Sequence, residues 1–147
     1  MIRILGRANS INVQKVMWTA AEVGSEVERQ DVGGAFGGND TPEYLTMNPN
    51  GRVPVLVEGD FVLWESQAIV RYLAEKSGKA PWWAAKIEDR AHANQWMDFY
   101  INSLHAHMTA IFWGLIRTTP EKRDMAAIGK AIAEASKAWA IVDAHLA

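Results

Sequence analysis

Two polar side chains stand where a helix is expected to begin, close to the start of the chain. Ser10 and Asn12 follow a short apolar run that ends at Gly6, and a helical pattern of apolar residues starts at Val13. Side chains of this kind can cap a helix by accepting hydrogen bonds from its free N–H groups. They can also donate hydrogen bonds to an anion at the positive end of the helix dipole. Spacing alone favours capping and leaves the second role open.

A second polar pair, Glu65-Ser66, opens another predicted helix, and capping again explains its residue types. Between the two helices lies Val53-Pro54, with a proline inside a pattern that otherwise indicates a strong strand. Because proline cannot donate to a strand ladder, the position requires either an edge strand or a cis bond that redirects the backbone. We favour a cis Val53–Pro54 bond.

The elements that must position these residues form a mixed α/β domain over residues 1–78. Period-two and helical patterns predict strands at 2–5, 27–32, 53–57 and 61–64, with helices starting near 13, 43 and 66. The order β-α-β-α-β-β-α implies one parallel β-α-β unit followed by an antiparallel hairpin.

The rest of the chain is predicted to be helical. Residues 79–87 have the composition of a linker, and residues 88–147 form an all-α domain with one long helix from about 88 to 116. Thr118 and Glu121 stand at capping-box spacing and mark the next helix start. The last segment carries an apolar seam that requires a partner helix, at Ile128, Ile132, Ala135, Trp139, Val142 and Leu146. Since the sequence stops at Ala147, we expect this helical domain to be partial.

Composition excludes several classes of function. The 147 residues contain no cysteine, so disulfides and thiolate metal sites are impossible, and no other metal site is expected. The net charge is −2, which gives no electrostatic basis for binding nucleic acid. No apolar stretch is long enough to cross a membrane, and no signal peptide is visible, so we expect a cytoplasmic protein.

Two motifs together carry a family resemblance. The segments "NPNGRVPVL" and "ESQAIVRYLAE", in this order of elements, resemble the cytosolic glutathione transferases over the whole chain. The resemblance implies a thioredoxin-like, glutathione-binding first domain and an all-helical second domain. The position that matches the family's catalytic residue is Ser10, as in theta- and delta-like classes, while Asn12 resembles the bacterial nu-like enzymes.

The resemblance also implies a role for each candidate residue. Ser10 and Asn12 would donate hydrogen bonds to the sulfur of glutathione, and the backbone of Val53, before Pro54, would pair with its cysteinyl part. Ser66 would hold the γ-glutamyl carboxylate and Glu65 the γ-glutamyl ammonium. Arg52 and Lys15 are candidates for the glycine carboxylate, with Asn39 as a third.

The resemblance therefore implies a glutathione transferase that conjugates the thiol of glutathione to a small apolar electrophile, with a role in detoxification and a homodimeric assembly. Two alternatives stay open. One is a glutathione-dependent disulfide reductase, in which bound glutathione replaces a protein cysteine. The other is a glutathione-binding or regulatory module without turnover.

Overall fold

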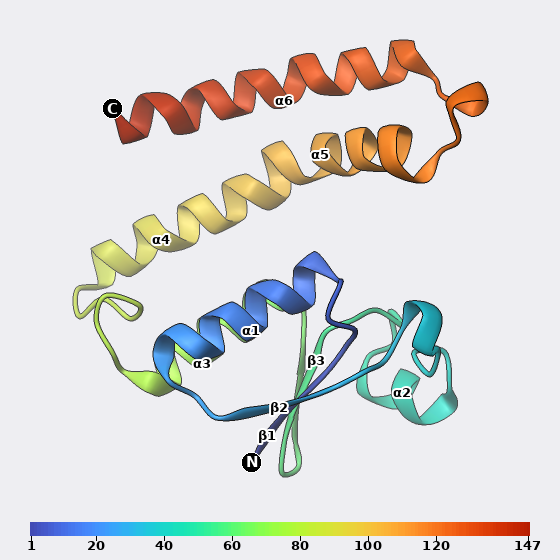
Figure 1. Ribbon diagram of the computed structural model, residues 1–147. Helices are drawn as coiled ribbons and strands as arrows, with labels where there is room; N and C mark the ends of the chain where they lie inside the picture. Colours follow the sequence, from blue (N-terminus) through green and yellow to red (C-terminus); the bar gives the residue numbers. More distant parts are fainter. The chain divides into compact units, whose positions relative to one another are not determined.

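The chain folds into two units, Met1–Lys86 and Ile87–Ala147, in a computed structural model that describes residues 1–147 (Figure 1). The stretch predicted as a linker therefore belongs almost wholly to the first unit. None of the helices is long and apolar enough to cross a bilayer.

The first unit is built on a four-stranded mixed sheet. Along the chain its elements are β1 (Ile2–Leu5), α1 (Ile11–Val23), β2 (Val27–Gln30), α2 (Pro42–Met47), β3 (Val55–Glu58), β4 (Phe61–Trp64) and α3 (Ser66–Ser77). The strand order is β2-β1-β3-β4, with β1 parallel to β2 and antiparallel pairing from β1 to β3 and from β3 to β4. The predicted order of elements and the thioredoxin-like class are confirmed.

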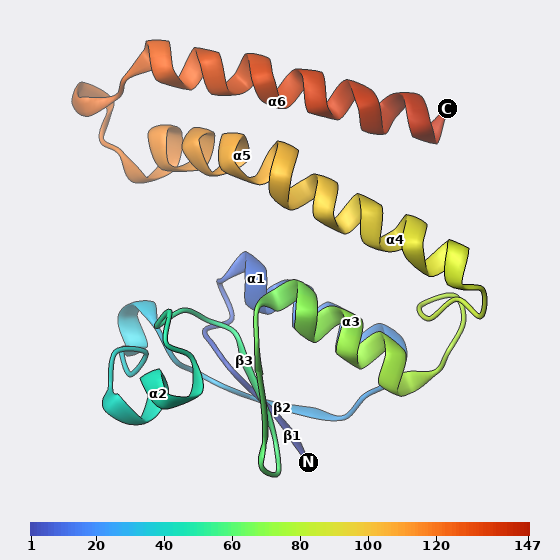
Figure 2. The ribbon, with the colours of Figure 1, turned by 180° about the vertical axis from the view of Figure 1, so that it is seen from behind.

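Each face of this sheet has its own core. On one face α1 and α3 lie side by side (Figures 1 and 2), because their apolar stripes meet the inward side chains of β1 and β3. The fully buried members of this core include Ile4, Val13, Val16, Leu56, Ile69 and Leu73. On the other face Leu5, Val55 and Val57 pack with Tyr44 of α2. Burial on both faces fixes the register of the short strands, since a slip of one residue would exchange the two faces.

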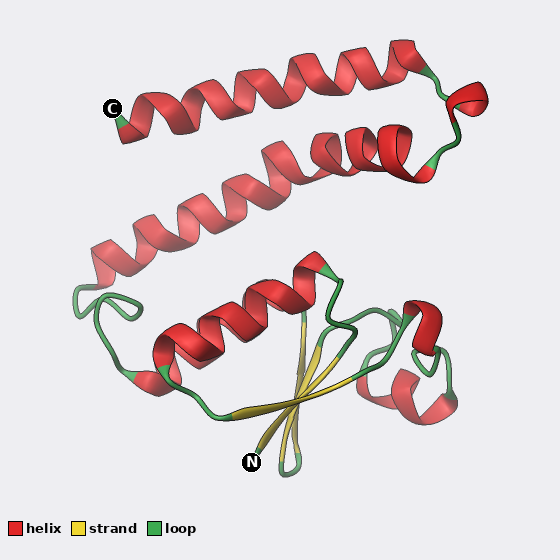
Figure 3. Ribbon diagram, in the orientation of Figure 1, coloured by secondary structure: helices red, strands yellow, loops and turns green.

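The second unit is a pair of antiparallel helical segments (Figure 3). The first contains α4 (Ile87–Phe99) and α5 (His105–Phe112), each followed by a π-helical turn, at Tyr100–Leu104 and Trp113–Arg117. The second is α6 (Met125–Leu146), which packs along α5 and both π-helical turns. The long helix predicted for 88–116 is therefore continuous from Ile87 to Arg117, with one π-helical turn inside it and a second at its end.

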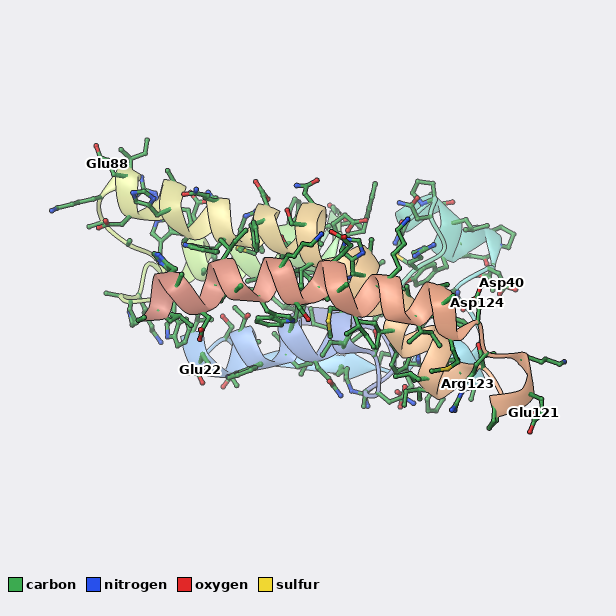
Figure 4. The ribbon with its side chains drawn as sticks, turned by 90° about the horizontal axis from the view of Figure 1, so that it is seen from above. Glu22, Asp40, Glu88, Glu121, Arg123 and Asp124 are labelled. Atoms are coloured by element: carbon green, nitrogen blue, oxygen red, sulfur yellow. The ribbon has the colours of Figure 1, made fainter.

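The start of α6 also corrects the sequence-based prediction. Asp124, not Thr118, caps this helix, by accepting a hydrogen bond from the N–H of Ala127 at 2.9 Å. Arg123 closes the preceding connection by donating to the carbonyl oxygens of Leu115 and Thr118, at 2.7 and 3.2 Å. Figure 4 shows Arg123 and Asp124 together in this connection.

The buried face of α6 differs from the predicted seam as well. The side chains that it buries are those of Ile128, Ala131, Ala135 and Ala138, whereas Ile132, Trp139 and Leu146 are exposed. The alanines allow the two helical segments to approach closely. Of the predicted seam, Ile128 and Ala135 are buried in this contact, and the larger Ile132, Trp139 and Leu146 lie outside it.

Candidate functional site

The candidate residues of the first unit meet at one edge of the sheet. Leu5 at the end of β1 pairs with Val55 at the start of β3, and Val55 pairs with Trp64 at the end of β4. The segments that continue from these three residues therefore leave the sheet at the same edge. They carry Ser10, Pro54 and the Glu65-Ser66 pair, which are far apart in sequence.

Ser10 occupies the N-cap position of α1 without using its side chain as a cap. Its backbone is extended, with φ −89° and ψ 122°, and its hydroxyl makes no hydrogen bond to the helix. Its carbonyl accepts the first helical bond, from the N–H of Gln14 at 2.9 Å. The residue is 8% exposed. The hydroxyl and the first free N–H groups of α1 are thus both left for another partner.

Asn12 faces the other helix. Its Oδ1 accepts a hydrogen bond of 3.4 Å from the hydroxyl of Ser66, the first residue of α3. Ser66 is buried, with 7% exposure. This contact joins the N-terminal turns of α1 and α3, which also pack along their lengths. Two helix N-termini, each with a buried serine, are therefore brought together at the edge of the sheet.

Glu65 has the most unusual backbone in the chain. It is the only non-glycine residue with a positive φ, at φ 72° and ψ 113°, and its side chain does not cap α3. A side-chain-bearing residue in this region costs on the order of 1–3 kcal/mol, and such strain is concentrated at functional sites. The strained turn directs the chain from β4 into α3 and leaves Glu65 exposed beside the start of that helix.

The Val53–Pro54 bond is cis, as predicted. The loop before it is held by two buried side chains that both donate to the carbonyl oxygen of Arg52. Tyr44 Oη does so at 2.7 Å and Asn48 Nδ2 at 2.8 Å. Asn48 also accepts from the N–H of Asn50 at 3.0 Å. We call this arrangement the Arg52 bracket; it fixes the backbone immediately before Val53.

Sequence reasoning missed Tyr44 and Asn48 as positioning residues. The stretch Asn48-Pro49-Asn50-Gly51 indicated a helix end but not a bracket. The sequence did contain a local signal for one of these bonds. The side-chain oxygen of an asparagine commonly accepts a hydrogen bond from the backbone N–H two residues later. The role of Tyr44 depends on tertiary contact. Its burial raises the pKa of the phenol to about 12.

The remaining candidates are Arg52, Asn39 and Lys15. Arg52 is exposed. Asn39 donates from Nδ2 to the carbonyl of Gly51 at 2.7 Å, so part of its amide is used to hold the loop. Lys15 is half-buried on α1; burial lowers its pKa, and the nearby Glu65 carboxylate acts in the opposite direction. The structure has no group of three or more His, Cys, Asp or Glu side chains that could hold a metal ion.

Comparisons with known proteins agree with this architecture. Residues 2–75 match the family model "Glutathione S-transferase, N-terminal domain". The chain is 44% identical to glutathione S-transferase GstB of Escherichia coli K12 over 149 aligned residues, which cover 100% of this chain and 72% of that protein. It is also 44% identical to dichloromethane dehalogenase of Methylophilus leisingeri over 77 residues, or 51% of this chain and 29% of that one.

A solved structure is similar over both units. The theta class glutathione S-transferase of Xanthomonas axonopodis pv. citri, with glutathione bound, superimposes with a TM-score of 0.92. It shares 45% identity and covers 99% of this chain and 70% of its own. The chain belongs to the glutathione transferase family.

Proposed function

We propose that this chain binds glutathione at the shared sheet edge and activates its thiol as a thiolate for conjugation to a small apolar electrophile. As a member of its family the chain is a glutathione transferase, with glutathione as co-substrate. The observation that carries the site assignment is the register of Leu5, Val55 and Trp64, which brings Ser10, Pro54 and Ser66 to one edge.

Ser10 supplies the group that holds the sulfur. Its hydroxyl is not spent on capping α1 and lies at the positive end of that helix. A cysteinyl thiol has a pKa near 8.5, so only a few per cent is ionised at neutral pH. A hydrogen bond to a charged group contributes about 1.5–3 kcal/mol, and a helix N-terminus adds about 0.3–1 kcal/mol. At about 1.4 kcal/mol per unit, these terms lower the thiol pKa by roughly one to three units.

The thiolate then attacks the electrophile. A carbon–sulfur bond forms from the sulfur lone pair, and the leaving group departs with the electrons of its bond to the same carbon. The proton of the thiol has already left to solvent. The protein's part is to keep the sulfur ionised while its peptide is held in place.

The peptide of glutathione would be held from both sides of the sulfur. The backbone of Val53, fixed by the Arg52 bracket, pairs with the cysteinyl part as an added strand. Ser66 at the start of α3 takes the γ-glutamyl carboxylate, where free N–H groups favour an anion, and Glu65 takes the ammonium. Arg52 is proposed for the glycine carboxylate, with Asn39 holding the loop beside it.

The direct test compares the wild-type chain with Ser10→Ala. Glutathione affinity is measured by calorimetry, and conjugation is followed with two electrophiles, an aryl halide and dichloromethane. Dichloromethane is chosen because the Methylophilus relative is a dichloromethane dehalogenase. We expect Ser10→Ala to retain glutathione binding and to lose conjugation by about 10- to 100-fold. A wild-type chain that binds glutathione but conjugates neither electrophile, and instead reduces a small-molecule disulfide while two glutathione molecules are oxidised to glutathione disulfide, would favour the reductase alternative.

We also propose a homodimer with a cytoplasmic role in detoxification. The resemblance to the family supports this, and light scattering on the purified chain tests the dimer. A mass equal to one chain across the micromolar range would contradict it.

A further inference from the structure

We infer that the side chain of Asn12 serves the γ-glutamyl end of the site through Ser66, and does not hold the sulfur. Asn12 would then be a positioning residue for Ser66, and Ser10 would be the side chain at the start of α1 that contacts the sulfur. This inference rests on the proposed function, since it names the part of glutathione on which each residue acts.

The first support is the contact itself. The Ser66 hydroxyl donates to Asn12 Oδ1 at 3.4 Å, across 54 residues of sequence. It links the first turns of two helices that pack together, at a point where Ser66 is buried and Asn12 is half-buried. No comparable contact engages the hydroxyl of Ser10, which makes no bond to the helix that it begins.

The second support is direction. Asn12 stands four residues before Val16, so it lies on the same face of α1 as the buried stripe that contains Val13, Val16, Ala20 and Val23. That stripe packs toward α3 and the sheet. Ser10 precedes the helix and has an extended backbone, so its side chain leaves the chain in another direction. The fold therefore turns Asn12 toward Ser66.

The chemistry of an amide suits this role. The Ser66 hydroxyl has one proton, and a bound carboxylate is a stronger acceptor for it than an amide oxygen. When the proton swings to the ligand, the amide of Asn12 can turn and donate from Nδ2 to Ser66 Oγ. Because an amide both accepts and donates, Asn12 holds Ser66 Oγ in one place before and after binding. Fixing one polar side chain in advance changes affinity by about 2- to 10-fold.

Replacement by aspartate provides a sharper contrast than alanine. An ionised carboxylate can only accept, so Asn12→Asp would keep the Ser66 proton away from the ligand and would repel the γ-glutamyl carboxylate. The affinity order expected for the γ-glutamyl group is wild type, then Asn12→Ala, then Asn12→Asp. Asn9→Ala is the matched control, because Asn9 is an exposed asparagine in the turn just before α1.

The experiment separates the sulfur from the peptide by using two ligands on the full chain. S-methylglutathione has no thiol proton, so its affinity reports the peptide subsites, while the ultraviolet absorbance of bound glutathione against pH reports the thiol pKa. We expect Asn12→Ala to weaken S-methylglutathione by about 2- to 10-fold and to leave the bound thiol pKa unchanged. Ser10→Ala should raise the pKa of the bound thiol and leave the affinity for S-methylglutathione unchanged. Asn12→Ala should add nothing in a Ser66→Ala background, and Asn9→Ala should change neither quantity.

Two results would overturn the inference. One is an Asn12→Ala variant that raises the bound thiol pKa while it binds S-methylglutathione as wild type does. The other is full additivity of Asn12→Ala and Ser66→Ala. Either result leaves the proposed function standing if wild type binds glutathione with a lowered thiol pKa. Failure of the wild-type chain to bind either ligand removes the proposed function together with the inference. Thermal unfolding of each variant shows that the chain is folded.

Discussion

The Arg52 bracket predicts that Tyr44 and Asn48 stabilise the first unit in a coupled way. Tyr44 and Asn48 are 3% and 2% exposed, and both donate to the same carbonyl oxygen. The perturbation is Tyr44→Phe, Asn48→Ala and the double variant. Tyr44→Phe removes one hydrogen bond and keeps the ring in the core, whereas Asn48→Ala removes two, because Asn48 also accepts from Asn50.

The magnitudes follow from these bonds. A typical hydrogen bond contributes about 1 kcal/mol net, so Tyr44→Phe should cost about 1 kcal/mol and Asn48→Ala about 2 kcal/mol. Each single variant still leaves the carbonyl of Arg52 with one donor. The double variant leaves that oxygen without either of its two donors. An unsatisfied, part-buried acceptor lowers the free energy of unfolding by about a further 1–3 kcal/mol. We therefore expect the double variant to lose about 4–6 kcal/mol, more than the two single losses together.

Urea unfolding of the four proteins, followed by far-ultraviolet circular dichroism, measures these differences. The same samples should bind glutathione more weakly in the order of their destabilisation, because the bracket fixes the backbone before Val53. Strict additivity of the two substitutions, to within about 0.3 kcal/mol, would refute the reasoning, since independent sites are expected to add to that accuracy.

Three further perturbations have signs that the structure fixes. Burial raises the pKa of Tyr44 to about 12, while a tyrosine in the unfolded chain titrates near 10. The contribution of the Tyr44 hydroxyl to the free energy of unfolding is therefore complete below pH 10 and is lost as the pH rises toward 12. Between pH 10 and 12 the free energy of unfolding of wild type, measured by urea unfolding, should fall by up to about 2–3 kcal/mol more than that of Tyr44→Phe. Equal pH dependence of stability in the two proteins would contradict this. A Cβ at Gly114 would lie 2.6 Å from Cγ1 of Ile128, so Gly114→Ala should destabilise the second unit by about 1–3 kcal/mol. Gly129→Ala, in open space on α6, should stabilise it by about 0.5–1 kcal/mol, and thermal unfolding compares the two. Glu65→Gly should relieve about 1–3 kcal/mol of backbone strain in the same assay while it weakens glutathione binding, and a loss of stability would contradict the strain argument.

Most of the first unit could be predicted because its signals are local. Strand and helix periods, Thr41 with Pro42 at the start of α2, and the proline of Val53-Pro54 each act over a few residues. Thr41 does cap α2, by accepting from the N–H of Tyr44 at 3.3 Å. The strand that contains Val53-Pro54 was placed too early, since β3 begins only at Val55 after the cis bond.

The second unit was predicted less well because its helices depart from a constant period. Two π-helical turns, after α4 and after α5, each add a residue to a turn and rotate the apolar face. Ile101, Met108 and Phe112 are exposed, although a 3.6-residue period places them on the same side as the buried Leu104. At α6 the buried face consists of Ile128 and three alanines, Ala131, Ala135 and Ala138, and the larger Ile132, Trp139 and Leu146 are exposed.

The candidate site shows the same limit. The helix starts at Ser10 and at Glu65-Ser66 could be predicted from local patterns, whereas the roles proposed for these residues come from the family resemblance. The bond between Asn12 and Ser66 could not, because it depends on how two helices that are far apart in sequence pack together. The same holds for Tyr44, whose hydroxyl meets Arg52 only after α2 has folded onto the sheet.

The central claim is that Ser10 and the start of α1 hold the sulfur of glutathione as an anion. The most direct measurement is the thiol pKa of glutathione bound to wild type and to Ser10→Ala, from thiolate absorbance against pH. We predict a bound pKa at least one unit below the free value of about 8.5 in wild type, with most of that shift lost in Ser10→Ala. A bound pKa equal to the free value, or one that Ser10→Ala leaves unchanged, would contradict the account.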